Sequence, residues 1–130
     1  MKFGYTIVYV DNVRASLDFF ERAFGLKTSF LDEAAGYGEL DTGSTALAFA
    51  SHALMAELLP EGYVSSQESA RPLGVEIGLF VEDVAAVHRQ ALACGAIELA
   101  PPKRTPWGQL VAFVRCPDGT LVEICTPTQR

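Results

Sequence analysis

Basic residues are scarce in this chain of 130 residues, which has 10 lysines and arginines against 16 aspartates and glutamates. The resulting formal net charge of -6 argues against a nucleic-acid partner, because binding to phosphate groups requires a basic face. The same charge is compatible with a neutral or cationic small ligand. A mild acidic excess also aids solubility by itself, so the charge alone does not choose between these interpretations.

Long apolar runs are also lacking, although 49% of the residues are hydrophobic. No run approaches the roughly 20 apolar residues that cross a membrane. No apolar signal-peptide segment of the usual length follows Met1-Lys2. We therefore expect a soluble cytoplasmic protein without a membrane partner.

Cysteines are few, and none belongs to a C-x-x-C pair. Cys116 and Cys125 flank a predicted hairpin in which Cys125 lies opposite residue 111 or 112. At ~3.3 Å per residue, that position is too far from Cys116 for a disulfide. Together with Cys94, we expect three buried free thiols in a reducing compartment. No spacing suggests a Ser-His-Asp or Cys-His arrangement, and no glycine-rich phosphate loop is present.

The clearest local signal is a β-hairpin near the C-terminus. Two mostly apolar runs, residues 109–116 and 121–126, flank Pro117-Asp118-Gly119, and glycine accepts the positive φ that such a turn requires. Glu123 interrupts the second run. A buried carboxylate is unfavourable unless it meets a cation, a metal or hydrogen-bond donors. The group that Glu123 faces is therefore central to the function.

The first half of the chain predicts one helix among strands. Asn12 is a suitable N-cap for a helix whose apolar residues recur at helical spacing, and Gly25 ends it. Strands are predicted around this helix at residues 3–10, 27–31, 37–40 and 45–50.

The second half repeats this order. A strand at residues 75–81 precedes a helix that begins after Glu82-Asp83 and ends at Gly95. A short strand at residues 97–99 and a proline-rich connection at residues 101–106 then lead to the hairpin.

The two halves align with each other. Val10-Asp11-Asn12-Val13 lies over Val81-Glu82-Asp83-Val84, and 81 minus 10 gives an offset of 71 residues. Two copies of so long a pattern indicate a duplicated βαβββ module rather than a solenoid.

The domain organisation follows from this repeat. We predict a single domain over residues 1–130, made of two repeated modules at about 1–50 and 74–130. Residues 51–73 contain prolines, glycine and serines that interrupt the pattern. We interpret them as a linker or lid with a brief helical run at residues 53–59.

The motifs Tyr9-Val10-Asp11-Asn12-Val13, Ser16-Leu17-Asp18-Phe19-Phe20 and Pro117-Asp118-Gly119 followed by Glu123-Ile124 carry a family resemblance. The chain resembles the vicinal oxygen chelate superfamily, which includes glyoxalase I, bleomycin resistance proteins and extradiol dioxygenases. The resemblance implies an α+β fold in which two βαβββ modules form a half-barrel with a concave pocket and helices outside.

Metal enzymes of this superfamily place two ligands on each module. The resemblance puts the first-strand ligands at Tyr5 and Glu76, and the last-strand ligands at Glu123 and at Leu47 or Ala48. Leucine and alanine have no ligand atom, a neutral tyrosine is a poor ligand, and no histidine occupies any of the four positions. Because such sites usually need three or more protein ligands, we expect neither a complete metal site nor another cofactor.

The predicted ligand-binding residues combine aromatic rings with two carboxylates, and no catalytic residue is predicted. Aromatic faces attract cations, and carboxylates form ion pairs with cations. Each carboxylate could instead be structural, for instance paired with Arg115, and the rings could serve ordinary packing. His52 and His88 are interpreted as a loop histidine and a packing or surface histidine. The candidate set is Tyr5, Tyr9, Glu76, Phe80, Trp107 and Glu123.

The favoured function is binding of a small aromatic or cationic molecule without a complete metal site, as in bleomycin resistance proteins, which would imply a role in antibiotic resistance. The alternative is a lyase, isomerase or dioxygenase that uses a reduced metal site or Glu123 as a base. An interaction module with a vestigial pocket is a third interpretation. We expect a homodimer, because the open edges of a half-barrel favour association; the modules pair either within one chain or by swapping between two.

Overall fold

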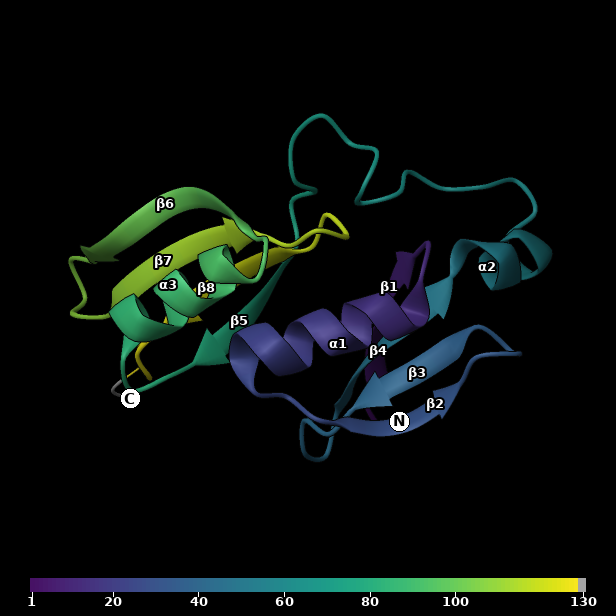
Figure 1. Ribbon diagram of the computed structural model, residues 1–130, viewed down its shortest axis with the longest axis horizontal. Coiled ribbons are helices and arrows are strands. Elements are labelled where there is room, and N and C mark those ends of the chain that lie inside the picture. The colour runs from purple at the N-terminus through teal and green to yellow at the C-terminus, as the bar shows by residue number, and fades with distance from the viewer. Residues whose placement is uncertain (129–130) are drawn as a thin grey trace.

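The computed structural model describes residues 1–128 and contains, within them, two four-stranded sheets and three helices (Figure 1). The first unit consists of β1 (Tyr5–Val10), α1 (Val13–Phe24), β2 (Thr28–Asp32), β3 (Tyr37–Leu40) and β4 (Ala46–Ser51). The second unit consists of β5 (Glu76–Phe80), α3 (Val84–Ala93), β6 (Ile97–Arg104), β7 (Leu110–Arg115) and β8 (Leu121–Cys125). The connecting segment between the units, residues 52–75, begins with α2 (His52–Leu58).

Both sheets have the same topology, which confirms the predicted repeat. The strand orders are β1-β4-β3-β2 and β5-β8-β7-β6, and the first strand of each unit pairs in parallel with its last strand. Ile7 lies opposite Ala48 in the first unit, and Gly78 lies opposite Glu123 in the second. The two sheets remain separate and do not close into a barrel.

The two long helices pack against each other on one side of the sheets (Figure 1). Asn12 caps α1 by accepting a hydrogen bond from the Ala15 amide at 3.0 Å, and Gly25 ends it with a left-handed φ of 72°. Asp83 caps α3 in the same way through the Ala86 amide at 3.0 Å. These caps satisfy amides that a helix leaves unpaired, as the sequence predicted.

One apolar core joins the helices to the inner faces of both sheets. It includes Phe20 on α1, Phe49 on β4, Val84 on α3, and Val122 and Ile124 on β8, all almost fully buried. Because side chains alternate along a strand, the neighbouring positions of each strand face away from the helices. This helix-free face carries the candidate residues.

A buried hydrogen bond also ties the two units together. The Ser16 hydroxyl on α1 donates to the Asp118 carboxylate in the β7–β8 turn at 2.8 Å. The same carboxylate accepts from the Thr120 amide at 3.0 Å. Asp118 therefore stabilises the predicted hairpin turn and also binds that turn to α1 of the first unit.

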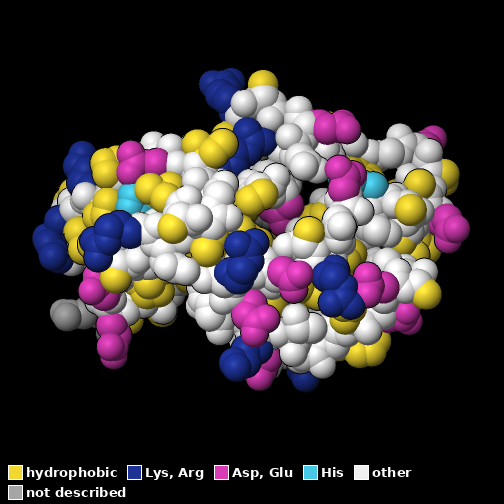
Figure 2. All heavy atoms as spheres, in the orientation of Figure 1, with side chains coloured by type: hydrophobic (Ala, Val, Ile, Leu, Met, Phe, Trp, Pro, Cys, Tyr) yellow, Lys and Arg dark blue, Asp and Glu magenta, His cyan; other side chains and the backbone are white. Residues whose placement is uncertain are grey.

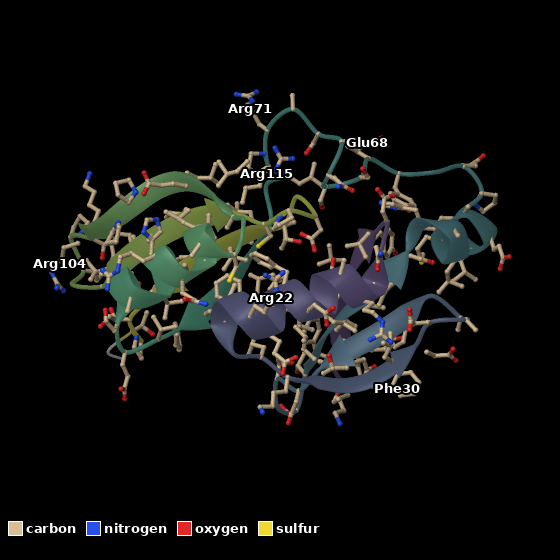
Figure 3. All side chains as sticks on the ribbon, in the orientation of Figure 1. Arg22, Phe30, Glu68, Arg71, Arg104 and Arg115 are labelled. Carbon is tan, nitrogen blue, oxygen red and sulfur yellow. The ribbon has the colours of Figure 1, made fainter. Side chains whose placement is uncertain are left out.

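The connecting segment is fixed to the second unit near its middle. Arg115 on β7 donates to the Ser66 carbonyl at 2.7 Å and to the Ser69 carbonyl at 2.8 Å, and Figure 3 shows Arg115 beneath this segment. A Cβ at Gly119 would lie 2.3 Å from the Ser66 carbonyl oxygen. The predicted hairpin glycine therefore also allows this close approach.

One strand is longer than the sequence indicated. The short strand predicted at residues 97–99 continues to Arg104, through the proline-rich stretch that we interpreted as a connection. β6 is at the edge of its sheet, where proline is tolerated because one side of the strand needs no amide donor. Its pairing with β7 shifts register around Ala100. No helix within residues 1–128 is both long and apolar enough to cross a membrane.

Two strand glycines allow a matched test of this packing. A Cβ at Gly38 would lie 2.8 Å from Leu17 Cδ1 and 3.1 Å from Val13 Cγ1, whereas a Cβ at Gly78 would meet nothing within 4 Å. We expect Gly38→Ala to lower the free energy of unfolding by about 1–3 kcal/mol, because it overpacks the contact with α1. Gly78→Ala should be neutral or stabilising by up to about 1 kcal/mol. Chemical denaturation of both variants measures this, and equal stabilities would contradict the packing described.

Candidate functional site

Two carboxylates meet on the helix-free face of the second unit. Glu76 pairs with Leu121 and Gly78 pairs with Glu123, so Glu76 and Glu123 are diagonal neighbours on adjacent strands with both side chains on the same face. Gly78 has no side chain between them and leaves open space beside Glu123. Glu76 is exposed and Glu123 is half-buried. We call these two residues the acid pair.

The Glu76 carboxyl keeps its proton to an unusually high pH. Burial of the Glu76 carboxyl, together with a hydrogen bond to Glu123 and repulsion from its charge, raises the pKa of Glu76 to about 7. A protonated Glu76 donates a hydrogen bond to the Glu123 carboxylate, and the two negative charges are then avoided. Near neutral pH Glu76 therefore gains and loses a proton readily.

No cation within residues 1–128 forms an ion pair with either carboxylate. Arg115, which the sequence offered as a structural partner, instead binds the carbonyls of the connecting segment. On the side of the molecule that carries α1 and α3, Figure 2 shows basic and acidic side chains interspersed, without a continuous basic surface.

An open cavity of about 930 Å³ lies on the Glu123 side of the acid pair. Trp107 is on its wall and is 72% exposed. The indole Nε1 donates to Gln109 Oε1 at 2.7 Å, and Gln109 Nε2 donates to the Thr126 carbonyl at 2.7 Å. Because Gln109 is buried, it holds the exposed indole in one orientation near Glu123.

A second cavity, of about 300 Å³, lies on the Glu76 side between β1, β5 and the connecting segment. We call it the connector cavity. Tyr9 and Tyr63 line it, with ring centroids 4.8 Å apart in an edge-to-face arrangement. The Tyr63 ring also stacks on His52, and its hydroxyl lies 2.6 Å from His52 Nδ1. His52 therefore lies near the connector cavity through Tyr63 instead of being a free loop residue.

The first unit has no carboxylate at the position matching Glu123. The strand registers make Ala48 its counterpart, whereas Leu47 belongs to the helix-facing core, which decides between the two residues that the sequence left open. Ala48 is fully buried and has no ligand atom. Within residues 1–128 no three His, Cys, Asp or Glu side chains are close enough to hold a metal, so the residues present do not fit the metal centre of the superfamily's enzymes.

Aromatic rings cover this face of the first unit. Tyr37 on β3 lies between Tyr5 and Phe30, with ring centroids 6.5 and 6.3 Å away. The Tyr37 hydroxyl donates to Glu39 at 2.5 Å, and burial, reinforced by this bond, raises the pKa of Tyr37. Figure 3 shows Phe30 at the outer edge of this unit.

The predicted site residues are therefore divided among several places. Glu76 and Glu123 meet, with Trp107 on one side of them and Tyr9 on the other. Tyr5 belongs to the aromatic cluster of the first unit, and Phe80 is 63% exposed near the gap between the units.

Sequence reasoning missed Tyr63 and Gln109 at the two cavities and Glu39 in the aromatic cluster of the first unit. Tyr63 and Gln109 give no periodic signal, and Glu39 lies within a short predicted strand. The signal that identified Glu123 is a charged residue within a predicted strand, and the same signal applies to Glu39. His88 is buried, with Nε2 3.2 Å from Glu98 Oε2, as predicted for a packing histidine. Cys94, Cys116 and Cys125 are free thiols; Cys116 and Cys125 are buried as predicted, whereas Cys94 near the end of α3 is only half-buried.

The fold and its paired first and last strands define a protein of the vicinal oxygen chelate type. The chain matches the profile of the Glyoxalase/Bleomycin resistance protein/Dioxygenase superfamily over residues 2–124, and it belongs to that superfamily. It is 30% identical over 128 residues to the uncharacterized protein YraH of Bacillus subtilis (strain 168), covering 95% of this chain and 97% of that one.

Solved structures share the fold. A glyoxalase-related enzyme from Fulvimarina pelagi superposes with a TM-score of 0.81 at 22% identity, covering 98% of this chain and 88% of that one. A bleomycin resistance determinant encoded on transposon Tn5 superposes with a TM-score of 0.65 at 22% identity, covering 99% and 100%. At these identities the similarity is one of fold.

The acid pair makes a prediction about stability and pH. The pKa of Glu76 is raised from 4.5 to about 7, so between these values the unfolded chain has lost a proton that the folded protein keeps. Rising pH therefore lowers the free energy of unfolding over this window. We expect the melting temperature of Glu76→Gln to fall less than that of the wild type from about pH 5 to about pH 8. Glu21→Gln, an exposed helix position, is the control, and identical pH profiles for all three proteins would contradict the shift.

Proposed function

We propose that this protein binds a small organic cation, aromatic in part, without a complete metal site. The observation that supports this most directly is the acid pair, which no described cation neutralises and which has an oriented indole beside it. A ligand cation placed between Glu76 and Glu123 relieves their repulsion. The Trp107 face adds a cation–π or stacking contact worth ~0.5–2 kcal/mol. Sequestration of this kind requires no chemical step and matches the bleomycin-resistance side of the superfamily.

Glu123→Gln tests the role of the carboxylate. The substitution keeps the shape and removes the charge, so we expect it to weaken binding of an organic cation by ~1–3 kcal/mol, the range for a charged hydrogen bond. The empty protein should be no less stable, because the repulsion within the acid pair is removed. Trp107 is the only tryptophan, so its fluorescence reports binding of each member of a panel that includes bleomycin, aromatic amines and their neutral analogues.

Glu82→Gln provides the matched control, since Glu82 is an exposed carboxylate in the same unit. It should change neither the affinity nor the melting temperature. A Glu123 that is salt-bridged in the core would behave differently, because its partner would be left buried and unpaired. A drop of several kcal/mol in the stability of unliganded Glu123→Gln would therefore overturn the proposal.

A second function is supported by the raised pKa of Glu76. A carboxyl that titrates near pH 7 suits proton transfer to and from carbon next to a carbonyl. The acid pair would then serve a lyase or isomerase, with Glu76 or Glu123 as the proton carrier. Under this alternative, Glu76→Gln abolishes turnover, whereas a binding protein has no turnover to lose.

We also propose that the protein is a homodimer. β1 and β5 are both at the ends of their sheet orders, and such edges readily pair with another strand. Leu58 and Leu59 on the connecting segment and Ile97 on β6 are exposed apolar side chains. We expect light scattering at micromolar concentration to give twice the mass of the chain. A monomer mass throughout that range would contradict this assembly.

A further inference from the structure

The connector cavity has features that the proposed function does not use. Most of its wall is apolar, including Ile7, Leu73, Ile77 and Leu121. Its volume of about 300 Å³ is at the lower end of the range for small-molecule sites. The cavity is therefore large enough for a compact molecule and too small for a large one without displacement of the connecting segment.

A buried hydroxyl in its lining has no partner. Thr120 lines the connector cavity and is 6% exposed, and its Oγ1 makes no hydrogen bond with the residues described. Its backbone amide is already used, since it donates to Asp118. Buried polar atoms without a partner are uncommon and unfavourable. A polar atom of a ligand would satisfy this hydroxyl.

The charges around the cavity determine which ligands it favours. Glu76 is on its wall, and no lysine or arginine lines it among the described residues. The Tyr9 ring comes from β1 and the Tyr63 ring from the connecting segment. Burial raises the pKa of Tyr63, so its phenol stays neutral. These groups attract a cation and repel an anion.

The cover of the cavity is held at two points. On one side, His52 contacts the Tyr63 hydroxyl, and its Nε2 lies 3.7 Å from Asp11 Oδ1. On the other side, Arg115 binds the Ser66 and Ser69 carbonyls. The intervening residues 64 and 65 line the cavity. The cavity is thus preorganised, which reduces the entropy lost on binding.

From these observations we propose that the connector cavity binds a compact, single-ring aromatic amine, with its ammonium group at Glu76 and the Thr120 hydroxyl and its ring between Ile7, Ile77 and Tyr9. This inference rests on the proposed function for the recognition of a cation by the acid pair. It adds the location of the ligand, on the side of Glu76 away from Trp107, and the chemical class of the ligand.

Isoleucine methyl groups locate the ligand directly. Ile7 and Ile77 line the connector cavity, whereas Ile97 and Ile124 do not. On titration of the methyl-labelled protein with 2-phenylethylamine, the Ile7 and Ile77 resonances should both shift while those of Ile97 and Ile124 stay in place. The neutral analogue 2-phenylethanol should bind at least about ten-fold more weakly, because it has no charge to pair with Glu76.

Three variants separate this cavity from the open one. Leu73→Trp should fill the connector cavity and abolish the methyl shifts, while Trp107→Phe should leave them unchanged. Thr120→Val should weaken the amine about 3- to 10-fold and raise the melting temperature of the empty protein, because it removes an unpaired buried hydroxyl. Unchanged melting of Leu73→Trp confirms that its loss of binding is local.

Proton release provides an independent readout. A bound ammonium group favours the ionised form of Glu76, so binding near pH 6 should release a proton, measured by calorimetry in buffers of different ionisation enthalpy. Glu123, Cys125 and the phenols of Tyr9 and Tyr63 are the other titratable groups facing this region. Glu76→Gln should abolish the release. Release that persists in this variant would overturn the assignment.

The failures are distinguishable. If the amine binds, but Trp107→Phe abolishes the shifts and Leu73→Trp does not, the ligand occupies the open cavity and only the further inference falls. If the amine does not bind while larger cations still quench Trp107, again only the inference falls. If neither 2-phenylethylamine nor any cation of the fluorescence panel binds, both the inference and the proposed function are overturned.

Discussion

Parallel pairing of the first and last strand within each unit is the constraint on which the site depends. In the second unit it places β5 beside β8, so that residues 76 and 123 become diagonal neighbours although the rest of the unit separates them in sequence. Strand alternation then directs both carboxylates away from the helices. Without this pairing, each glutamate would be an isolated polar residue, and the pKa of Glu76 would be raised by burial alone, without the added effect of Glu123.

The connecting segment turns a gap between two units into a defined cavity. Two different contacts hold this segment in place. The Arg115 guanidinium donates hydrogen bonds to backbone carbonyls of the segment. The Tyr63 ring packs against Tyr9, and its hydroxyl contacts the His52 imidazole. The close approach at Gly119 leaves no space for a side chain there. A turn residue of the hairpin thus also determines where the cover of the cavity lies.

The two units have kept one topology while their helix-free faces have diverged. Ala48 and Glu123 occupy matching positions, and the first unit fills its face with aromatic rings instead of carboxylates. Its one central carboxylate, Glu39, is bound by the Tyr37 hydroxyl. The closely spaced carboxylates of this face therefore lie in the second unit, and the first unit offers no carboxylate at the matching position 48.

Sequence patterns alone were enough to predict the repeated βαβββ order, the helix caps at Asn12 and Asp83, the hairpin at Asp118-Gly119 and the unusual position of Glu123. These features depend on periodicity and turn chemistry, which act over a few residues. β6 was longer than predicted because edge strands tolerate proline, a context that only the sheet order reveals.

Which side chains meet could be known only from the folded arrangement of the two units. It chose Ala48 over Leu47, assigned Arg115 to the connecting segment instead of a glutamate, and brought Tyr63 and His52 to the cavity beside Tyr9. Such contacts depend on strand register and on the path of a segment without regular structure. Local propensity does not encode either of these, because both follow from how the two units pack around one core.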